Sequence, residues 1–283
     1  MKVVIDSNQM RKPLLRSFLE KSKHNFAVIT DHCAMEAYKG NSLTGIVQSM
    51  EILSDYPSQV LVLKSSTTIS GLRGRESGLQ RRFIDPQQTS EFPQFIQQLK
   101  QSTSNNRSPL LKGLRDHEEA ATAYFQRMLN GTFDIGFAIE NIKKQYSKEE
   151  LNFIRKNEVP PVALINKITI GIFDLAAIIH GKYPYGNLKP RSHEFQNTLI
   201  FRLSLCTYLL SLKWAANGGI MKMSQEKVRN DLVDMYFVAY ATFFDGLMTA
   251  EKKVLSIHQD ARFWLSMLYG CKLPSGILGW QKP

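Results

Sequence analysis

The segment Val3-Val4-Ile5-Asp6-Ser7-Asn8 decides the fold class that the sequence predicts. Three β-branched residues in a row are typical of a buried strand, and the Asp-Ser-Asn sequence that follows is typical of a turn. Further strands are predicted over residues 26–30, 60–63 and 246–249, with helical patterns between them. Strands that alternate with helices predict an α/β fold with a central, mainly parallel sheet.

The helical patterns flank these strands at both ends of the chain. Apolar residues at helical spacing predict helices over residues 12–23, 31–38, 43–53, 225–242 and from 250 onward. Asp31 directly follows the second strand, which is the position of an N-cap, and we expect it to cap the next helix.

The composition changes between residues 67 and 225. This span carries 21 Lys and Arg against 13 Asp and Glu, a net charge of +8 out of +11 for the whole chain. We therefore divide the chain into a discontinuous α/β core, residues 1–66 and 226–283, and a basic, mostly α-helical insertion, residues 67–225. The positive charge makes a polyanion the first partner to expect.

The sequence favours a cytoplasmic location. Cys33, Cys206 and Cys271 are too far apart for a zinc site of paired cysteines, and the first residues lack the apolar run of a signal peptide. Residues 162–181 and 199–220 are apolar but contain charged residues, so we expect buried helices and no membrane span. We expect the apolar faces of these helices to be covered by each other or by a second copy of the chain, so the sequence also allows a homo-oligomer.

Acidic residues stand at strand ends and helix starts. Asp6 and Glu251 each follow a strand, and the carboxyl ends of parallel strands meet at one edge of the sheet. Asp231 and Asp234, three residues apart, share a helix face, and Glu36 lies in the helix after the second strand. Carboxylates crowded together raise each other's pKa unless a cation lies among them, and oxygen ligands suit Mg²⁺ or Mn²⁺.

The order of these segments resembles the PIN-domain nucleases. The matching pieces cover less than half of the chain and are Val3–Asn8, Ala27–Glu36, Asn230–Asp234 and Phe243–Lys252. The resemblance implies a three-layer fold and a metal-dependent endonuclease. It implies metal-binding, catalytic acids at Asp6, Glu36, Asp231 or Asp234, and Glu251. The chain departs from the family in having Glu251 where an Asp is usual, and in the length of its insertion.

Other residues are candidates for supporting roles. Asn8 and Thr249 are expected to donate hydrogen bonds to the acids, and Asp245 is either a turn residue or a further supporting acid. The basic loop is expected to contact phosphates, and its arginines are Arg73, Arg75, Arg81 and Arg82.

Three functions fit these residues. The leading hypothesis is a phosphodiester-cleaving nuclease with RNA favoured over DNA, and the resemblance implies a toxin, an antiviral defence effector or an RNA-processing enzyme. An inhibitory or activating protein partner stays open. The second is a nucleic-acid-binding or regulatory protein with a degenerate nuclease site. The third is a phosphatase-type hydrolase, disfavoured because Asn8 stands where that chemistry usually has a second Asp.

Overall fold

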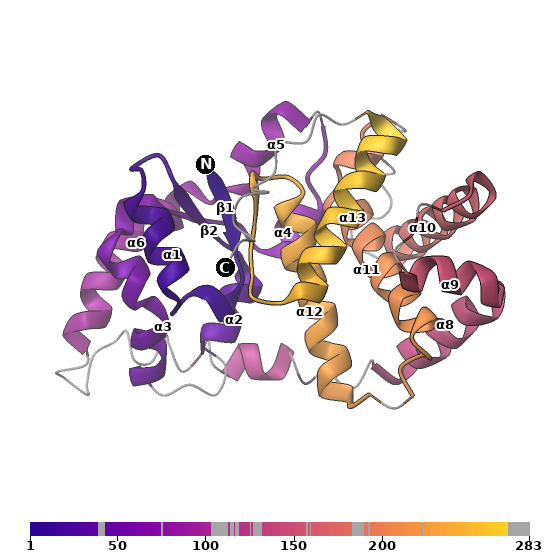
Figure 1. Ribbon diagram of the computed structural model, residues 1–283. Helices are drawn as coiled ribbons and strands as arrows, with labels where there is room; N and C mark the ends of the chain where they lie inside the picture. Colours follow the sequence, from indigo (N-terminus) through magenta and orange to yellow (C-terminus); the bar gives the residue numbers. More distant parts are fainter. Residues whose placement is uncertain are drawn as a thin grey trace.

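A four-stranded, fully parallel sheet organises the described part of the chain (Figure 1). The computed structural model describes residues 1–38, 43–74, 76–102, 113, 116, 119–124, 126, 132–156, 158, 160–182, 190–191, 193–221 and 223–270. The strand order is β3-β2-β1-β4. The strands are β1 (Lys2–Ile5), β2 (Phe26–Ile29), β3 (Val60–Val62) and β4 (Gly246–Met248). The predicted α/β class, the four strands and their parallel arrangement are confirmed.

The sheet joins the two ends of the sequence. β1 pairs with β2 on one side and with β4 on the other, where Val3 lies opposite Gly246 and Ile5 opposite Met248. Because β1 has a neighbour on each side and helices against it, Val3, Val4 and Ile5 are fully buried. The apolar run that predicted this strand reflects burial on both faces.

Three helices connect the first three strands: α1 (Pro13–Glu20), α2 (Asp31–Tyr38) and α3 (Leu43–Asp55). Proline at the first position of α1 costs no hydrogen bond there. At α2, the Thr30 hydroxyl accepts the hydrogen bond from the Cys33 backbone N–H at 3.0 Å. The prediction that Asp31 caps this helix was therefore wrong by one residue, because Thr30 takes that role.

The segment after β3 stays close to the sheet. It contains α4 (Ser66–Ser70), α5 (Glu76–Phe83) and α6 (Pro86–Ser102). Leu63 forms an antiparallel bridge with Ile84, and α6 packs against β3 and α3. Residues on both sides of the predicted boundary at 66 therefore contribute to the packing around the sheet.

In the described part of the chain, six helices, α8 to α13, form a second body around α11 (Figure 1). α11 packs against every other member of this group, and nearly all of its side chains are buried. The helices are α8 (Thr132–Gln145), α9 (Lys148–Lys156), α10 (Val162–Lys182), α11 (Leu199–Ala216), α12 (Gln225–Ala241) and α13 (Lys252–Tyr269). α12 also packs against β1 and β4, so one hydrophobic core runs through both bodies.

A buried arginine strengthens the junction between the two bodies. Arg202 of α11 donates to the Thr242 carbonyl at 2.6 Å and to the Gln196 carbonyl at 3.0 Å. Its guanidinium lies 3.6 Å from the centre of the Phe243 ring, just before β4. A fully buried charge needs such partners, so these contacts fix α11 against the chain that enters the sheet.

The two apolar helices differ in burial. Both α10 and α11 are long and apolar enough to cross a membrane by length and composition alone. The predicted burial is confirmed for α11, of which 78% is buried, whereas only 22% of α10 is buried within this chain. One face of α10 packs on α11, whereas Val162, Ile170 and Ile178 point away and are more than half exposed.

Candidate acidic site

Asp6 lies at the carboxyl end of β1 and is almost fully buried. Its carboxylate accepts hydrogen bonds from the Asn8 side chain at 2.7 Å, the Asn8 backbone N–H at 3.3 Å and the Thr249 hydroxyl at 2.6 Å. Burial raises the pKa of Asp6, and these hydrogen bonds oppose the rise. Asn8 and Thr249 thus lie where the sequence placed them, as donors to the first acid.

Glu36 reaches the same edge of the sheet from α2. Ser7, which follows Asp6, donates its hydroxyl to Oε2 of Glu36, and the same hydroxyl lies 3.5 Å from Oδ1 of Asp6. Ser7 thus bridges the first two acids, a role that the sequence analysis did not assign.

Asp234 of α12 is buried and has no partner among the described residues. Its side chain is 8% exposed, and no hydrogen bond or ion pair reaches it from any residue that the structure describes. Burial, together with the charges of Glu251, Asp6 and Glu36, raises the pKa of Asp234 to about 8, although Lys253 opposes the rise. Four predicted acids therefore lie close enough to repel one another.

Asp231 lies one helical turn before Asp234 and has different surroundings. Its Oδ1 forms an ion pair with the ammonium group of Lys253, and its Oδ2 accepts a hydrogen bond from the Trp214 indole at 3.2 Å. Neither Lys253 nor Trp214 was predicted. Lys253 stands two residues after Glu251, so its position was a usable signal, whereas nothing in the sequence linked Trp214 to the acids.

Glu251 is exposed at the N-cap position of α13. Its backbone N–H donates to the Thr249 hydroxyl at 3.1 Å, which is the same hydroxyl that holds Asp6. Glu251 is therefore attached through one residue to the first acid, while its own carboxylate is free to face solvent.

The potential ligand atoms at this edge of the sheet are of the type that hard divalent cations prefer. They are all carboxylate oxygens, and Asp234 is a buried acid that forms no ion pair with a described residue. Among the described ranges, however, no three His, Cys, Asp or Glu side chains already stand in an arrangement that could hold a metal ion. A cation would therefore have to draw these carboxylates closer together.

Asp245 does not belong to this group. It precedes β4, and its Oδ2 accepts a hydrogen bond from the Lys2 backbone N–H at 2.6 Å, at the opposite edge of the sheet from Asp6. Of the two roles left open for it, the turn residue is the one that the structure supports.

The arginines also lie away from the acids. Arg81 and Arg82 are exposed in the last turn of α5, and Arg82 donates to the Arg73 carbonyl. α5 itself is held at the amino edge of the sheet, because Gln80 donates to the Phe243 carbonyl at 2.5 Å. Arg75 lies outside the described residues. The described arginines therefore do not surround the acidic site.

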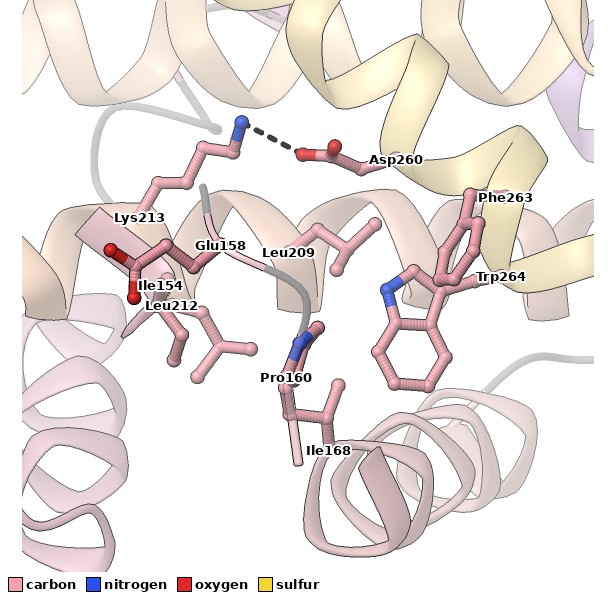
Figure 2. A pocket seen from close by; sticks show the side chains of 10 residues that line it. All are labelled: Ile154, Glu158, Pro160, Ile168, Leu209, Leu212, Lys213, Asp260, Phe263 and Trp264. Carbon is pink, nitrogen blue, oxygen red and sulfur yellow. Dashed lines mark ion pairs between the residues drawn. The ribbon is translucent and has the colours of Figure 1, made fainter. Parts of the chain in front are cut away.

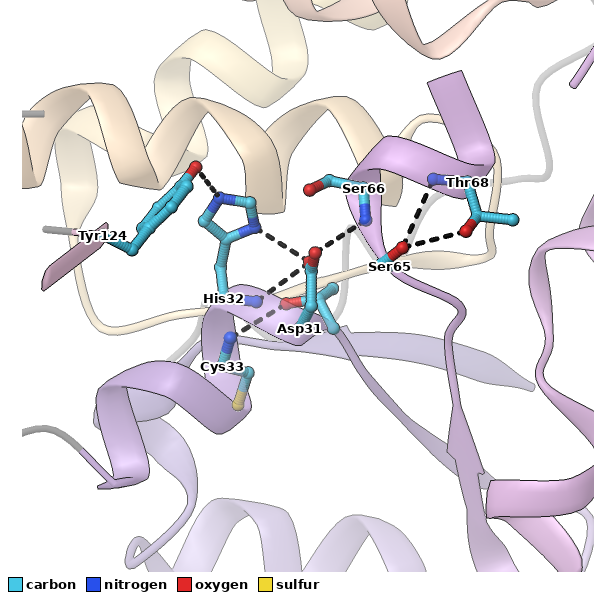
Figure 3. Close-up of polar contacts among 8 residues, drawn as sticks. Asp31, His32, Cys33, Ser65, Ser66, Thr68 and Tyr124 are labelled. Atoms are coloured by element: carbon cyan, nitrogen blue, oxygen red, sulfur yellow. Dashed lines mark hydrogen bonds and ion pairs between the residues drawn. The ribbon is translucent and has the colours of Figure 1, made fainter. Parts of the chain in front are cut away.

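A second polar cluster holds α2 in place beside the acids (Figure 3). Asp31 accepts from His32 Nδ1 at 2.9 Å and from the Ser66 backbone N–H at 2.6 Å, and His32 Nε2 lies 3.1 Å from the Tyr124 hydroxyl. Burial disfavours the charged form of Asp31, but these contacts outweigh it and lower its pKa. The His32 ring also stacks on Tyr236 of α12, so α2 and α12 are joined within about one turn of Glu36 and Asp234.

A cavity of about 220 Å³ opens on the helical body, between α9, α10, α11 and α13 (Figure 2). Its wall is mostly apolar and includes Leu209, Phe263 and Trp264, while Lys213 and Asp260 form an ion pair of 2.8 Å at its side. None of the five predicted acids lines it, so the cavity and the acidic site are separate features.

Comparison with protein-family models, curated proteins and solved structures finds no match to this chain.

Proposed function

We propose that the chain is a PIN-like, Mg²⁺- or Mn²⁺-dependent endonuclease that hydrolyses phosphodiester bonds and prefers RNA to DNA. The observation that carries the proposal is Asp234, a buried carboxylate that has no partner in the described part of the chain and lies within reach of the charges of three other acids. A buried acid crowded by other carboxylates holds its proton when nothing is bound, and it ionises when a cation lies beside it. A divalent cation is the counter-charge that this set of oxygen donors favours.

In this proposal some residues hold the cation and others position the acids. Asp6, Glu36, Asp234 and Glu251 are the acids that would hold the cation, and a bound divalent ion supplies the charge that a phosphodiester needs for attack by water. Asn8 and Thr249 fix the Asp6 carboxylate, and Ser7 fixes Glu36 relative to Asp6. No Ser, Cys or Lys nucleophile is required for this chemistry.

The fold and the cellular role that we propose rest on the resemblance to the PIN-domain nucleases, which lies in the order of the acids along the chain. A three-layer PIN-like core is supported by the parallel sheet, with α6 and α12 packed against its strands. The insertion, with its net charge of +8, is suited to hold a polyanion. A cytoplasmic toxin, defence effector or RNA-processing enzyme, held in check or activated by a protein partner, fits such a nuclease.

The test is a cleavage assay with RNA, single-stranded DNA and double-stranded DNA in Mn²⁺, Mg²⁺ or EDTA. We expect metal-dependent cleavage by the parent protein and none by Asp6→Asn or Asp234→Asn, with circular dichroism confirming that both variants fold. Asp55→Asn is the matched control, because Asp55, at the end of α3, is an exposed acid paired with Arg16 of α1. Cleavage in EDTA, or full activity of Asp6→Asn, contradicts the proposal.

The second candidate is a nucleic-acid-binding protein with a degenerate site. It is favoured by one observation, that no three potential ligands in the described ranges stand ready for a metal. This candidate predicts RNA binding that weakens steeply with salt, and no turnover with any divalent ion. Fluorescence anisotropy over a salt series, run beside the cleavage assay, separates the two.

A further inference from the structure

Asp231 and Asp234 lie one turn apart on the same helix but differ in their contacts. Both carboxylate oxygens of Asp231 are engaged, Oδ1 by Lys253 and Oδ2 by Trp214, whereas Asp234 has no partner in the described part of the chain. The sequence pattern left open which of the two acids binds a metal. The contacts distinguish them.

We infer that Asp231 is not a metal ligand but a positioning residue for Lys253, and that Lys253 binds a phosphate group of the substrate beside the metal. This inference rests on the proposed nuclease function and deepens it. It identifies Lys253 as the positively charged side chain that a substrate phosphate contacts at this otherwise acidic edge of the sheet.

The contacts of Asp231 disfavour metal binding by its carboxylate. If its carboxylate turned to a metal, the Trp214 indole N–H, which is buried, would lose its acceptor. A buried donor that is left without an acceptor is unfavourable, so this contact opposes the movement of the carboxylate. Asp234 carries no such cost, because it gives up no contact with a described residue when a cation binds.

The position of Lys253 suits a phosphate ligand. It lies in the first turn of α13, its side chain is 33% exposed, and its charge acts on Asp234. An ammonium group has three N–H donors, and the bond to Asp231 uses one, which leaves donors for a phosphate oxygen. A phosphate that approaches these carboxylates meets repulsion, and a fixed ammonium group beside them reduces it.

The test compares three properties in four variants. Mn²⁺ affinity is measured by calorimetry, RNA affinity by anisotropy in Ca²⁺, and folding by circular dichroism. The variants are Asp231→Asn, Asp234→Asn, Lys253→Met and Lys253→Arg. Lys252→Met is the matched control, because Lys252 is the exposed neighbour of Lys253.

Distinct results are expected for each acid and for the lysine. Asp231→Asn should keep its Mn²⁺ affinity within about threefold of the parent, whereas Asp234→Asn should lose at least about tenfold. Lys253→Met should weaken RNA binding about tenfold and reduce the salt dependence by about one charge, while Lys252→Met should change neither. If Lys253→Met fails to fold, Lys253→Arg with parental RNA affinity supports the same role for the charge.

Other results overturn the inference. If Asp231→Asn loses Mn²⁺ affinity as strongly as Asp234→Asn, Asp231 is a ligand and the inference fails while the nuclease proposal stands. Parental RNA affinity in a folded Lys253→Met variant removes the phosphate role, as does lost RNA affinity in a folded Lys253→Arg variant. If the parent protein binds no Mn²⁺ at all, the proposed function and this inference both fail.

Discussion

The Thr249 hydroxyl donates to Oδ2 of Asp6 over 2.6 Å, although the two residues stand 243 positions apart in the chain. This bond connects the carboxyl ends of β1 and β4. Thr249→Val keeps the shape of the side chain but removes the donor, so we expect a loss of about 1–2 kcal/mol in the free energy of unfolding at pH 7. Urea denaturation measures it, and Thr249→Ser, which retains a hydroxyl, should lose much less. Equal losses in both variants would mean that packing, not the hydrogen bond, matters.

The raised pKa of Asp234 makes the stability of the protein depend on pH. Its folded pKa of about 8 exceeds an ordinary aspartate value of about 4, so the folded state binds a proton that the unfolded state has lost between these values. Stability without metal therefore falls as pH rises through this window. We expect Asp234→Asn, which cannot ionise, to match the parent near pH 4 and to melt about 3–6 °C higher at pH 8.5. Thermal melts in EDTA over a pH series decide it; parallel curves for the two proteins would show that Asp234 ionises normally.

The same pKa predicts that metal binding releases protons. At pH 7 most Asp234 side chains in the metal-free protein are protonated, and a divalent cation binds the ionised form. We expect the heat of Mn²⁺ binding at pH 7 to depend on the ionisation enthalpy of the buffer, with a slope that reports the release of up to about one proton. Calorimetry in phosphate-free buffers of differing ionisation enthalpy measures the slope. Asp55→Asn should give the parental slope, and a slope near zero in the parent would contradict the raised pKa.

Two glycines of α10 offer a matched test of its packing. A Cβ at Gly171 would lie 2.0 Å from the hydroxyl oxygen of Tyr208, which bonds to the Tyr146 hydroxyl at 2.9 Å inside the helical body. Gly171→Ala should therefore displace Tyr208 and destabilise the protein by about 1–3 kcal/mol. A Cβ at Gly181 would meet no described atom within 4 Å, so Gly181→Ala should be neutral or stabilising by up to about 1 kcal/mol. Urea denaturation of both variants is the measurement, and equal effects would show that α10 does not pack on α11 through Gly171.

The sheet was predictable because short apolar runs between turn residues have few other interpretations. Val3, Val4 and Ile5 are apolar on both faces of a strand, and a strand of that kind belongs in the middle of a parallel sheet. Asp6 and Thr249 follow their strands, which by itself places them at one edge. Asp245 precedes its strand, and the same rule places it at the other edge.

The helical body was less predictable because composition does not say which faces find neighbours. α10 and α11 are similarly apolar, yet α11 is surrounded by helices and α10 has described neighbours on one face only. The pairing of Asp231 with Trp214 depends on how α11 crosses α12, and no local pattern records that crossing. Spacing put Asp231 and Asp234 on one face, but only the tertiary contacts distinguish them.

The pairing of β1 with β4 also sets the order in which the protein can mature. Asp6 and Glu36 are synthesised before Asp234, Thr249 and Glu251, which follow the whole insertion in the chain. Until these are synthesised, the early acids lack the residues that complete their edge of the sheet, and a nascent chain carries only half of the site. If the chain is the RNA-cutting nuclease that we propose, this order would leave it without a complete site while it is being synthesised.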